Sequence, residues 1–328
     1  MQNKRYVLHH APSDIDGASD VLIIRIKVIM HQKPLNDMHA RIVSYNADHY
    51  DPLDYSEGKY QYEDTGVENR FALVADIITS LNPDIVLMQE VYGRDQEETE
   101  SSIRHLAERT GLACEWEGRV TAAKSQHHNL GTGVLWGPRF QPEAYEPQFD
   151  FWQPLTALKG SIGGQSLDCA SYHGQPVGKA EAFGDRRLDE ARRLASFVRR
   201  HPHMILGGDW NGAAAVQGPD GWLDPDPDPE TPMHQTMTSH EIEFVLNRQA
   251  AVALQEHGLI DLAAHYALAN NFQLDRTTGS RATREGPQRL DRFYASLEIA
   301  KRISSVIVVK NPLTDKAADH YPLVLDLE

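Results

Sequence analysis

The stretch HMILGGDWN, residues His203–Asn211, carries the strongest local signal in this chain. Its apolar run Met204–Leu206 predicts a short buried strand, and the Gly-Gly pair that follows predicts that the strand stops in a tight turn. Asp209 and Asn211 are two positions apart, so in extended chain their side chains point the same way. The stretch therefore predicts a carboxylate and a carboxamide side by side at a strand end, where functional sites on β scaffolds tend to lie.

Other predicted strands also end in polar side chains. These residues are Asn46, Glu90, His173, Asp291, Asp319 and His320. A hard cation such as Mg2+ binds one or two carboxylates together with water and substrate phosphate, a role that suits Glu90 and Asp319. An attack on phosphorus also needs a group that orients or deprotonates water, and Asp209 held by Asn211 suits that role. These residue types indicate a metal-assisted reaction at phosphorus.

The histidines fit the same chemistry. A protonated histidine beside a metal stabilises the charge that develops on phosphoryl oxygens. A neighbouring carboxylate keeps such a histidine protonated and oriented. Asp291 is the candidate partner of His320.

Six short segments that carry these residues resemble the endonuclease/exonuclease/phosphatase superfamily, the fold of DNase I and of the abasic-site endonucleases. In the family's order they are Ser44–Asn46, Asp84–Glu90, Ser171–His173, Gly208–Asn211, Leu290–Phe293 and Asp319–Pro322. The resemblance covers about residues 38–328. It implies an α/β fold, a four-layered α/β/β/α sandwich of two mainly antiparallel sheets with helices outside. It also implies Mg2+ as the cofactor, with Mn2+ as an alternative.

The resemblance further implies a role for each matching residue. On the metal side, Glu90 is the main ligand, Asp319 a second carboxylate, and Asn46 positions metal-bound water or phosphate. Asp209 orients or deprotonates the attacking water, and Asn211 orients Asp209 and the substrate.

On the phosphate side, the resemblance implies that His173 contacts the scissile phosphate or assists the leaving oxygen. His320 binds the phosphoryl oxygen in the transition state, and Asp291 supports His320. Arg186 and Arg187 belong to a basic helix face, which we interpret as a solvated face balanced by neighbouring acidic residues. A minor alternative is that Arg186 or Arg187 reaches the substrate phosphate.

The periodicity of apolar residues predicts the order of the elements. Strands are expected at 40–46, 84–88, 119–123, 133–136, 155–158, 166–172, 204–206, 290–295, 303–309 and 323–327. Helices are expected at 67–81, 97–110, 186–200 and 241–257. This alternation favours one domain over residues 38–328. Residues 1–37 lack caps and periodicity, and we interpret them as an irregular extension or as the product of a start site placed too early.

Composition limits the function. The 328 residues contain 32 basic and 47 acidic side chains, a net charge of -15, which argues against binding nucleic acid mainly by bulk attraction to phosphates. Only Cys114 and Cys169 are present, which excludes a disulfide framework and a cysteine-based zinc site. No stretch predicts a membrane span or a secretory signal. We therefore expect a cytoplasmic protein with no obligate protein partner.

The main hypothesis is a metal-dependent phosphoesterase that uses in-line attack of activated water, with nucleic acid as its substrate. One alternative is a phosphatase or phosphodiesterase on a small molecule, such as a phosphoinositide, a phospholipid head group or a nucleotide. A second alternative is a catalytically silent binding module of the same fold.

Overall fold

The structure, a computed structural model, describes residues 39–47, 70–93, 96–123, 126–176, 184–219, 221–224, 237–279 and 288–328. They belong to one compact unit, Asn36–Glu328. The predicted extension, residues 1–37, lies outside the described residues.

The first sheet contains the first and the last strand of the domain. Its six strands lie in the order β14 (Ile303–Val308), β15 (Leu323–Leu327), β1 (Ala40–Asn46), β2 (Ile85–Gly93), β4 (Gln126–Trp136) and β3 (Ala113–Ala123). Only β1 and β2 run parallel, and the other neighbours are antiparallel.

The second sheet is built from the middle of the chain. Its seven strands are β12 (Ile260–Asp261), β13 (Asp291–Ala295), β9 (Met204–Asp209), β8 (Asp168–His173), β6 (Thr156–Ile162) and β5 (Phe140–Tyr145) in that order, with β7 (Gln165–Ser166) beside β6. The pair β8 and β9 is parallel, and the other neighbours are antiparallel. A separate small hairpin joins β10 (Gln217–Gly218) to β11 (Gly221–Trp222).

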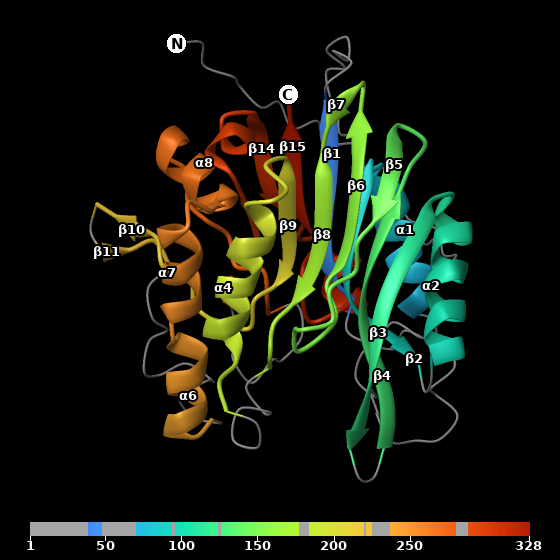
Figure 1. The fold of residues 1–328 in the computed structure, drawn as a ribbon, viewed down its shortest axis with the longest axis horizontal. Helices are drawn as coiled ribbons and strands as arrows, with labels where there is room; N and C mark the ends of the chain where they lie inside the picture. Colours follow the sequence, from blue (N-terminus) through green and yellow to red (C-terminus); the bar gives the residue numbers. More distant parts are fainter. Residues whose placement is uncertain are drawn as a thin grey trace, which may run out of the picture. The chain divides into compact units, whose positions relative to one another are not determined.

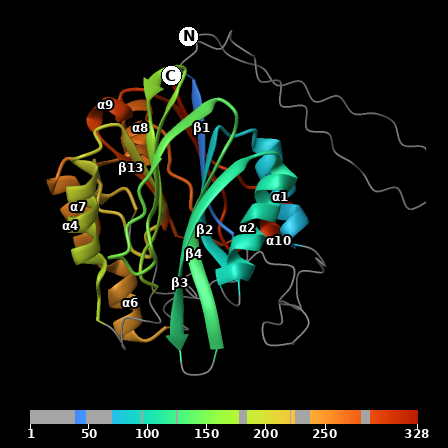
Figure 2. The ribbon, with the colours of Figure 1, turned by 45° about the vertical axis from the view of Figure 1, so that its right-hand side comes forward.

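Helices cover the outer faces of both sheets (Figures 1 and 2). On the first sheet they are α1 (Arg70–Leu81) and α2 (Gln96–Thr110), and on the second they are α4 (Arg187–Val198) and α7 (Gln249–Glu256). The other helices in the described part of the chain are α6 (Ser239–Leu246), α8 (Leu262–Asn270), α9 (Leu297–Ala300) and α10 (Thr314–Ala317).

Alternation along each strand explains the layers. In β1 and β2, Ile42 and Leu87 belong to the core between the sheets, whereas Val43 and Val86 pack under the helices of the first sheet. Successive side chains of a strand point to opposite faces, so a continuous apolar strand is buried on both sides. The predicted four-layered α/β/β/α sandwich is confirmed.

The two parallel pairs position the functional residues. In the first sheet Asn46 ends β1 beside Gln89, its register partner within β2, immediately before the bulge in that strand. In the second sheet His173 of β8 is the register partner of Asp209 of β9. Polar residues from four strands therefore leave the two sheets at one end of the sandwich, the lower end in Figure 1.

Three predictions about local structure are wrong. The strand expected at 84–88 does not end at Gln89 and Glu90, because β2 continues past a bulge to Gly93. The Gly-Gly pair does not end β9, which continues to Asp209. A Cβ on Gly208 would lie 1.8 Å from the carbonyl oxygen of Tyr172, so that glycine allows close packing against β8. The single helix expected over 241–257 is two helices, because Asn247 leaves the helical conformation and its side chain accepts from the Gln249 amide.

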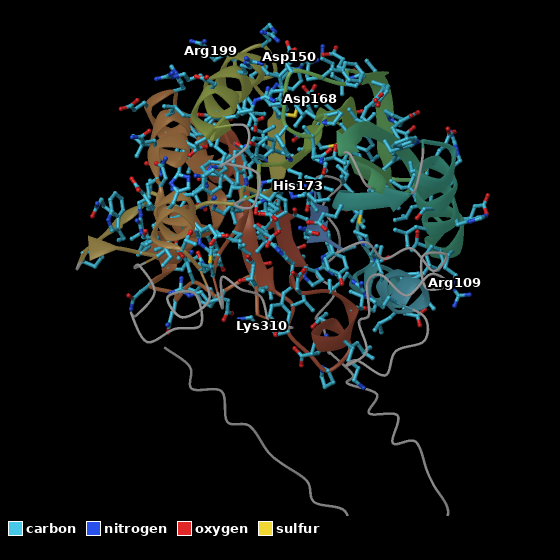
Figure 3. All side chains as sticks on the ribbon, turned by 90° about the horizontal axis from the view of Figure 1, so that it is seen from below. Arg109, Asp150, Asp168, His173, Arg199 and Lys310 are labelled. Carbon is cyan, nitrogen blue, oxygen red and sulfur yellow. The ribbon has the colours of Figure 1, made fainter. Side chains whose placement is uncertain are left out.

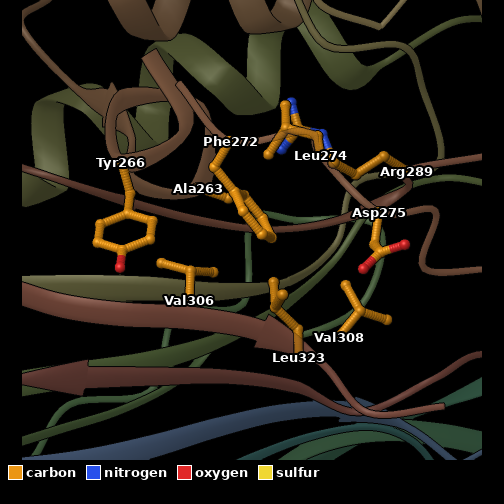
Figure 4. A pocket seen from close by; sticks show the side chains of 9 residues that line it. All are labelled: Ala263, Tyr266, Phe272, Leu274, Asp275, Arg289, Val306, Val308 and Leu323. Carbon is orange, nitrogen blue, oxygen red and sulfur yellow. The ribbon is translucent and has the colours of Figure 1, made fainter. Parts of the chain in front are cut away.

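The sequence interpretation also missed several elements, among them β5 and α8. The α8 segment LAAHYALAN is apolar almost throughout and so has no helical periodicity. Helix α8 packs on β14 around a small pocket of about 10 Å3 whose lining includes Tyr266, Val306 and Arg289 (Figure 4). Within the described residues, no helix is both long enough and apolar enough to cross a bilayer.

A buried ion triad holds the second sheet to the β10–β11 region. Arg289 is 4 % exposed and donates to both carboxylate oxygens of Asp224 and to both of Asp261. Burial acts to raise the pKa of Asp224, but Arg289 outweighs burial and lowers it. This stabilising contribution is therefore complete at neutral pH and is lost only as the pH falls below the ordinary value of 3.8.

Replacing Arg289 by methionine should reduce the free energy of unfolding by about 3–5 kcal/mol, because two buried carboxylates lose their common partner. Denaturant unfolding measures the change. Arg276→Met is the matched control: Arg276 also contacts Asp224, but its side chain is 36 % exposed, so the loss should stay below about 1 kcal/mol. Equal losses for both variants would contradict the importance of the triad.

Candidate active site

Asp209 lies at the centre of the polar cluster where the two sheets end. It closes β9 and is 2 % exposed. The side-chain amide of Asn46, at the end of β1 in the other sheet, donates to Asp209 Oδ2 at 3.1 Å and to Glu90 Oε1 at 3.2 Å. Asn46 thus connects two carboxylates that belong to different sheets.

Two buried histidines face the same oxygen of Asp209. The Nε2 atoms of His173 and His320 each lie 3.8 Å from Asp209 Oδ2. His173 Nε2 also lies 3.7 Å from Glu90 Oε1. Seen from the end of the sandwich where β8 finishes, His173 lies near the centre of the domain (Figure 3).

Neither ring nitrogen of His173 makes a hydrogen bond within the described part of the chain, although the residue is 3 % exposed. Buried polar atoms in native proteins nearly always have a partner. The unpartnered imidazole therefore indicates that this site receives polar atoms from outside the chain.

Asp291 orients the second histidine. Its Oδ2 lies 2.7 Å from His320 Nδ1, and Asp291 itself is fixed on β13, directly opposite Asp209. Burial acts to lower the pKa of His320, but the carboxylates of Asp291, Asp319 and Asp209 outweigh burial and raise it well above 6.5. His320 is therefore held as an imidazolium that keeps Nε2 directed at the centre of the site.

Asn211 acts through a tight turn. Its backbone has a left-handed φ of 46°, and its amide donates to Asp209 Oδ1 at 2.8 Å. Its side chain donates to the Gly174 carbonyl, in the segment that follows β8. The expectation that Asp209 and Asn211 point the same way along extended chain is therefore wrong, and the contact between them is made by the backbone.

Glu90 and Asp319 lie at the more open side of the site. Glu90 sits at a bulge in β2, with a φ of 55°, and its side chain is 20 % exposed. Asp319 is 34 % exposed, and its Oδ1 lies 4.0 Å from His320 Nε2. A β-bulge re-aims a side chain, which brings Glu90 towards Asn46 and His173.

The family model of the endonuclease/exonuclease/phosphatase family matches residues 43–320. The chain belongs to this family. Enzymes of this family generally hydrolyse phosphoester bonds. The match confirms the family resemblance of the six sequence segments. The comparison with curated proteins found no match.

Solved structures of family members share the fold at low sequence identity. A family protein from Leptotrichia buccalis is 15 % identical with a TM-score of 0.58, an AP endonuclease from Archaeoglobus fulgidus is 17 % identical with 0.57, and a Neisseria 3' phosphatase bound to a product DNA hairpin is 17 % identical with 0.56. Each alignment covers 88 % of this chain and 99 % of the other. These structures support the fold of this family member.

The chemistry of the donor set fits a divalent cation of the kind the family fold implies. Glu90 offers a carboxylate oxygen beside the Asn46 amide, and Mg2+ in proteins commonly takes only one or two carboxylates. Across the described ranges, no group of three or more histidine, cysteine, aspartate or glutamate side chains converges as a metal site. A cation bound here would have few protein oxygen ligands, so water and substrate would fill its other coordination positions.

A polar bridge beneath the site is a feature that the sequence interpretation missed. Gln89 donates to Ser171 Oγ at 2.9 Å, and Ser171 donates to the Met88 carbonyl at 2.6 Å, so the bridge connects the two sheets. Ser171 lies two residues before His173, on the same face of β8. The sequence shows that Ser171 and His173 are two residues apart, but only the packing of the two sheets shows that Gln89 is the partner of Ser171.

The interpretation of the basic helix face is wrong for Arg187. Arg187 is 3 % exposed, forms an ion pair with Asp185 and donates to the carbonyls of Asn211 and Phe244. It therefore supports the turn that holds Asp209. Arg186 immediately precedes α4, and its amide donates to Gln175; a role in substrate binding remains a prediction.

Proposed function

We propose that this family member is a divalent-metal-dependent phosphoesterase that hydrolyses its substrate by in-line attack of water, and that it acts as a nuclease. One observation supports the proposal most strongly: Asp209 Oδ2 lies within 3.8 Å of the Nε2 atoms of both His173 and His320. A carboxylate between two imidazoles can accept a proton from water while the imidazoles bind the reacting phosphoryl group.

Asp209 is the base in this proposal. The Asn211 amide holds its Oδ1, and the Asn46 side chain holds its Oδ2, so the carboxylate cannot rotate. It accepts the proton as the water oxygen bonds to phosphorus. Asn46 and Asn211 thus contribute to the reaction by orienting the Asp209 carboxylate.

The histidines act on the phosphoryl group. His320 donates from Nε2 to a phosphoryl oxygen, because Asp291 accepts from its Nδ1 and fixes the ring. Within the described residues, the ring nitrogens of His173 have no hydrogen-bond partner. One of them can therefore donate to a second phosphoryl oxygen or to the leaving oxygen. Donors placed where charge develops are among the largest contributions to such catalysis.

The metal would be held on the Glu90 side of the site. Glu90 is the main proposed ligand for Mg2+ or Mn2+, with Asn46, which donates to it, and Asp319 as the other proposed oxygen ligands. When bound, such an ion supplies positive charge that polarises the phosphoryl group.

A substrate panel with Mg2+ tests the proposal. The panel contains supercoiled DNA, single-stranded DNA, RNA, an abasic duplex, a phosphoinositide and a generic phosphodiester. Cleavage of one or more nucleic acids supports the nuclease assignment. Hydrolysis of the phosphoinositide alone would favour the small-molecule phosphatase, which the net charge of -15 supports. No hydrolysis of any member would favour the silent binding module.

For a nucleic-acid substrate, we expect affinity to fall steeply with salt, with a slope in log-log form of about -0.9 for each phosphate contacted on duplex DNA. Binding titrations with a catalytically reduced variant between low and physiological salt measure the slope. The small generic phosphodiester is the control and should show little dependence. A flat response for DNA and RNA would contradict a nucleic-acid substrate.

We also propose a cytoplasmic location. The two cysteines, Cys114 and Cys169, are both free, as is usual in a reducing compartment.

A further inference from the structure

Arg292 is a buried cation next to the site that forms no ion pair within the described residues, although it lies close enough to Asp224 to help lower the pKa of that carboxyl. It follows Asp291 on β13, and strand alternation places its side chain on the opposite, helix-covered face of the second sheet. It is 2 % exposed. Its Nη2 donates to the Gly212 carbonyl at 2.7 Å, but within the described residues Nε and Nη1 have no hydrogen-bond partner and the side chain makes no ion pair.

A small cavity lies beside this guanidinium. It has a volume of about 10 Å3, and its lining includes Arg292, Trp210, Gly212 and Ala250 of α7. The guanidinium is in contact with this space, because it bonds to Gly212 and its Cζ lies 6.0 Å from the Trp210 ring centre. The cavity has roughly the room of one water-sized group.

The other polar groups that line the cavity are already engaged. Trp210 donates its indole N–H to the Arg292 carbonyl, the Tyr172 hydroxyl donates to Glu190, and the Asn247 amide donates to Asp185. Arg187 also lines the cavity, but it pairs with Asp185 and donates to the Asn211 and Phe244 carbonyls. Nε and Nη1 of Arg292 are the nitrogens in this lining that have no hydrogen-bond partner within the described residues.

The nearby carboxylates are also taken. Asp185 pairs with Arg187, whereas Asp224 is shared by Arg276 and Arg289, and Arg289 also takes Asp261. A buried charge without a partner costs several kcal/mol. A water molecule could accept from Nε and Nη1, but only an anion would also neutralise the charge.

We propose that this cavity binds one small monovalent anion, chloride in the cell, through Nε and Nη1 of Arg292. The site lies directly behind the residues that hold the base Asp209. Arg292 binds the Gly212 carbonyl and Arg187 binds the Asn211 carbonyl, so both arginines fix the turn after Asp209. A bound anion keeps Arg292 in place and thereby stabilises this turn.

Diffraction with bromide tests the site directly. A crystal soaked in sodium bromide should show an anomalous peak in the cavity within hydrogen-bond distance of Arg292 Nε and Nη1. Density for water alone at this position, while bromide occupies other sites in the same crystal, would overturn the proposal.

Thermal unfolding tests it in solution without any substrate. At constant ionic strength, the wild-type Tm should be about 3 °C higher in sodium chloride than in sodium gluconate, whose anion is too large for the cavity. Arg292→Gln should abolish this difference. Arg199→Gln, which removes an exposed arginine, should preserve it and so controls for general salt effects.

An equal Tm difference between chloride and gluconate in wild type and in Arg292→Gln would contradict the site. A wild-type Tm that is the same in both salts would also contradict it. Should Arg292→Gln fail to fold, Ala250→Val provides the second variant, because it fills the cavity and keeps the arginine. It should lose both the chloride dependence and the bromide peak, and retention of either would overturn the proposal. Neither readout uses hydrolysis, so the result is independent of the proposed function.

Discussion

Replacing Asp209 with asparagine should lower the turnover of a generic phosphodiester by at least about a hundredfold, the usual weight of a general base and its electrostatic contribution. The carboxamide has nearly the same shape, but it cannot accept the proton of the attacking water. It also cannot accept from both Asn211 and Asn46, since one of its two terminal atoms is a donor. Initial rates at saturating Mg2+ measure the effect.

Asp189→Asn is the matched control for Asp209→Asn. Asp189 lies on α4, and its side chain is 70 % exposed, so this variant should keep the wild-type rate. Thermal melts of both variants establish that the domain is folded. Comparable rates for wild type and Asp209→Asn would remove Asp209 from the reaction.

Chelation of divalent cations should reduce hydrolysis to background, and added Mg2+ or Mn2+ should restore it. Glu90→Gln should raise the Mg2+ concentration needed for half-maximal rate by about tenfold or more, because it removes the charge of the main proposed ligand. A Mg2+ titration of the rate measures both effects.

The control for Glu90 is Glu298→Gln, which changes an exposed glutamate of α9 whose side chain is 77 % exposed. Its Mg2+ dependence should match that of the wild type. Activity that persists in excess chelator would exclude the metal role given to Glu90.

The positions of strands that carry site residues were predictable from local sequence. Apolar runs such as Met204–Leu206 are buried on both faces, so their pattern identifies the strand, although the end of β9 lies at Asp209, beyond the predicted stop. Polar residues directly after such runs were therefore found without knowledge of the sheet. The break at Asn247 was not found, because a side chain that bonds to its own backbone competes with the helix in a way that periodicity does not record.

Residues that support the site were harder to predict. The sequence predicts a surface position for Arg187, because most of its neighbours on α4 are polar. In the structure its guanidinium is buried and donates to the carbonyls of Asn211 and Phe244. Gln89 and Ser171 lie 82 residues apart in the chain. Their hydrogen bond depends on how two sheets pack, and local sequence carries no information on that packing.

The sequence by itself determined most of the strands near which the polar site residues lie, the order of these residues, and the family to which the chain belongs. It did so because strand burial is a local property of the chain. Tertiary structure alone decided that Asn46 reaches Asp209 across the sheets, that both histidines face one oxygen, and that Arg292 lies unpaired behind them. These arrangements depend on sheet order, register and helix packing, which arise from contacts between residues far apart in the chain.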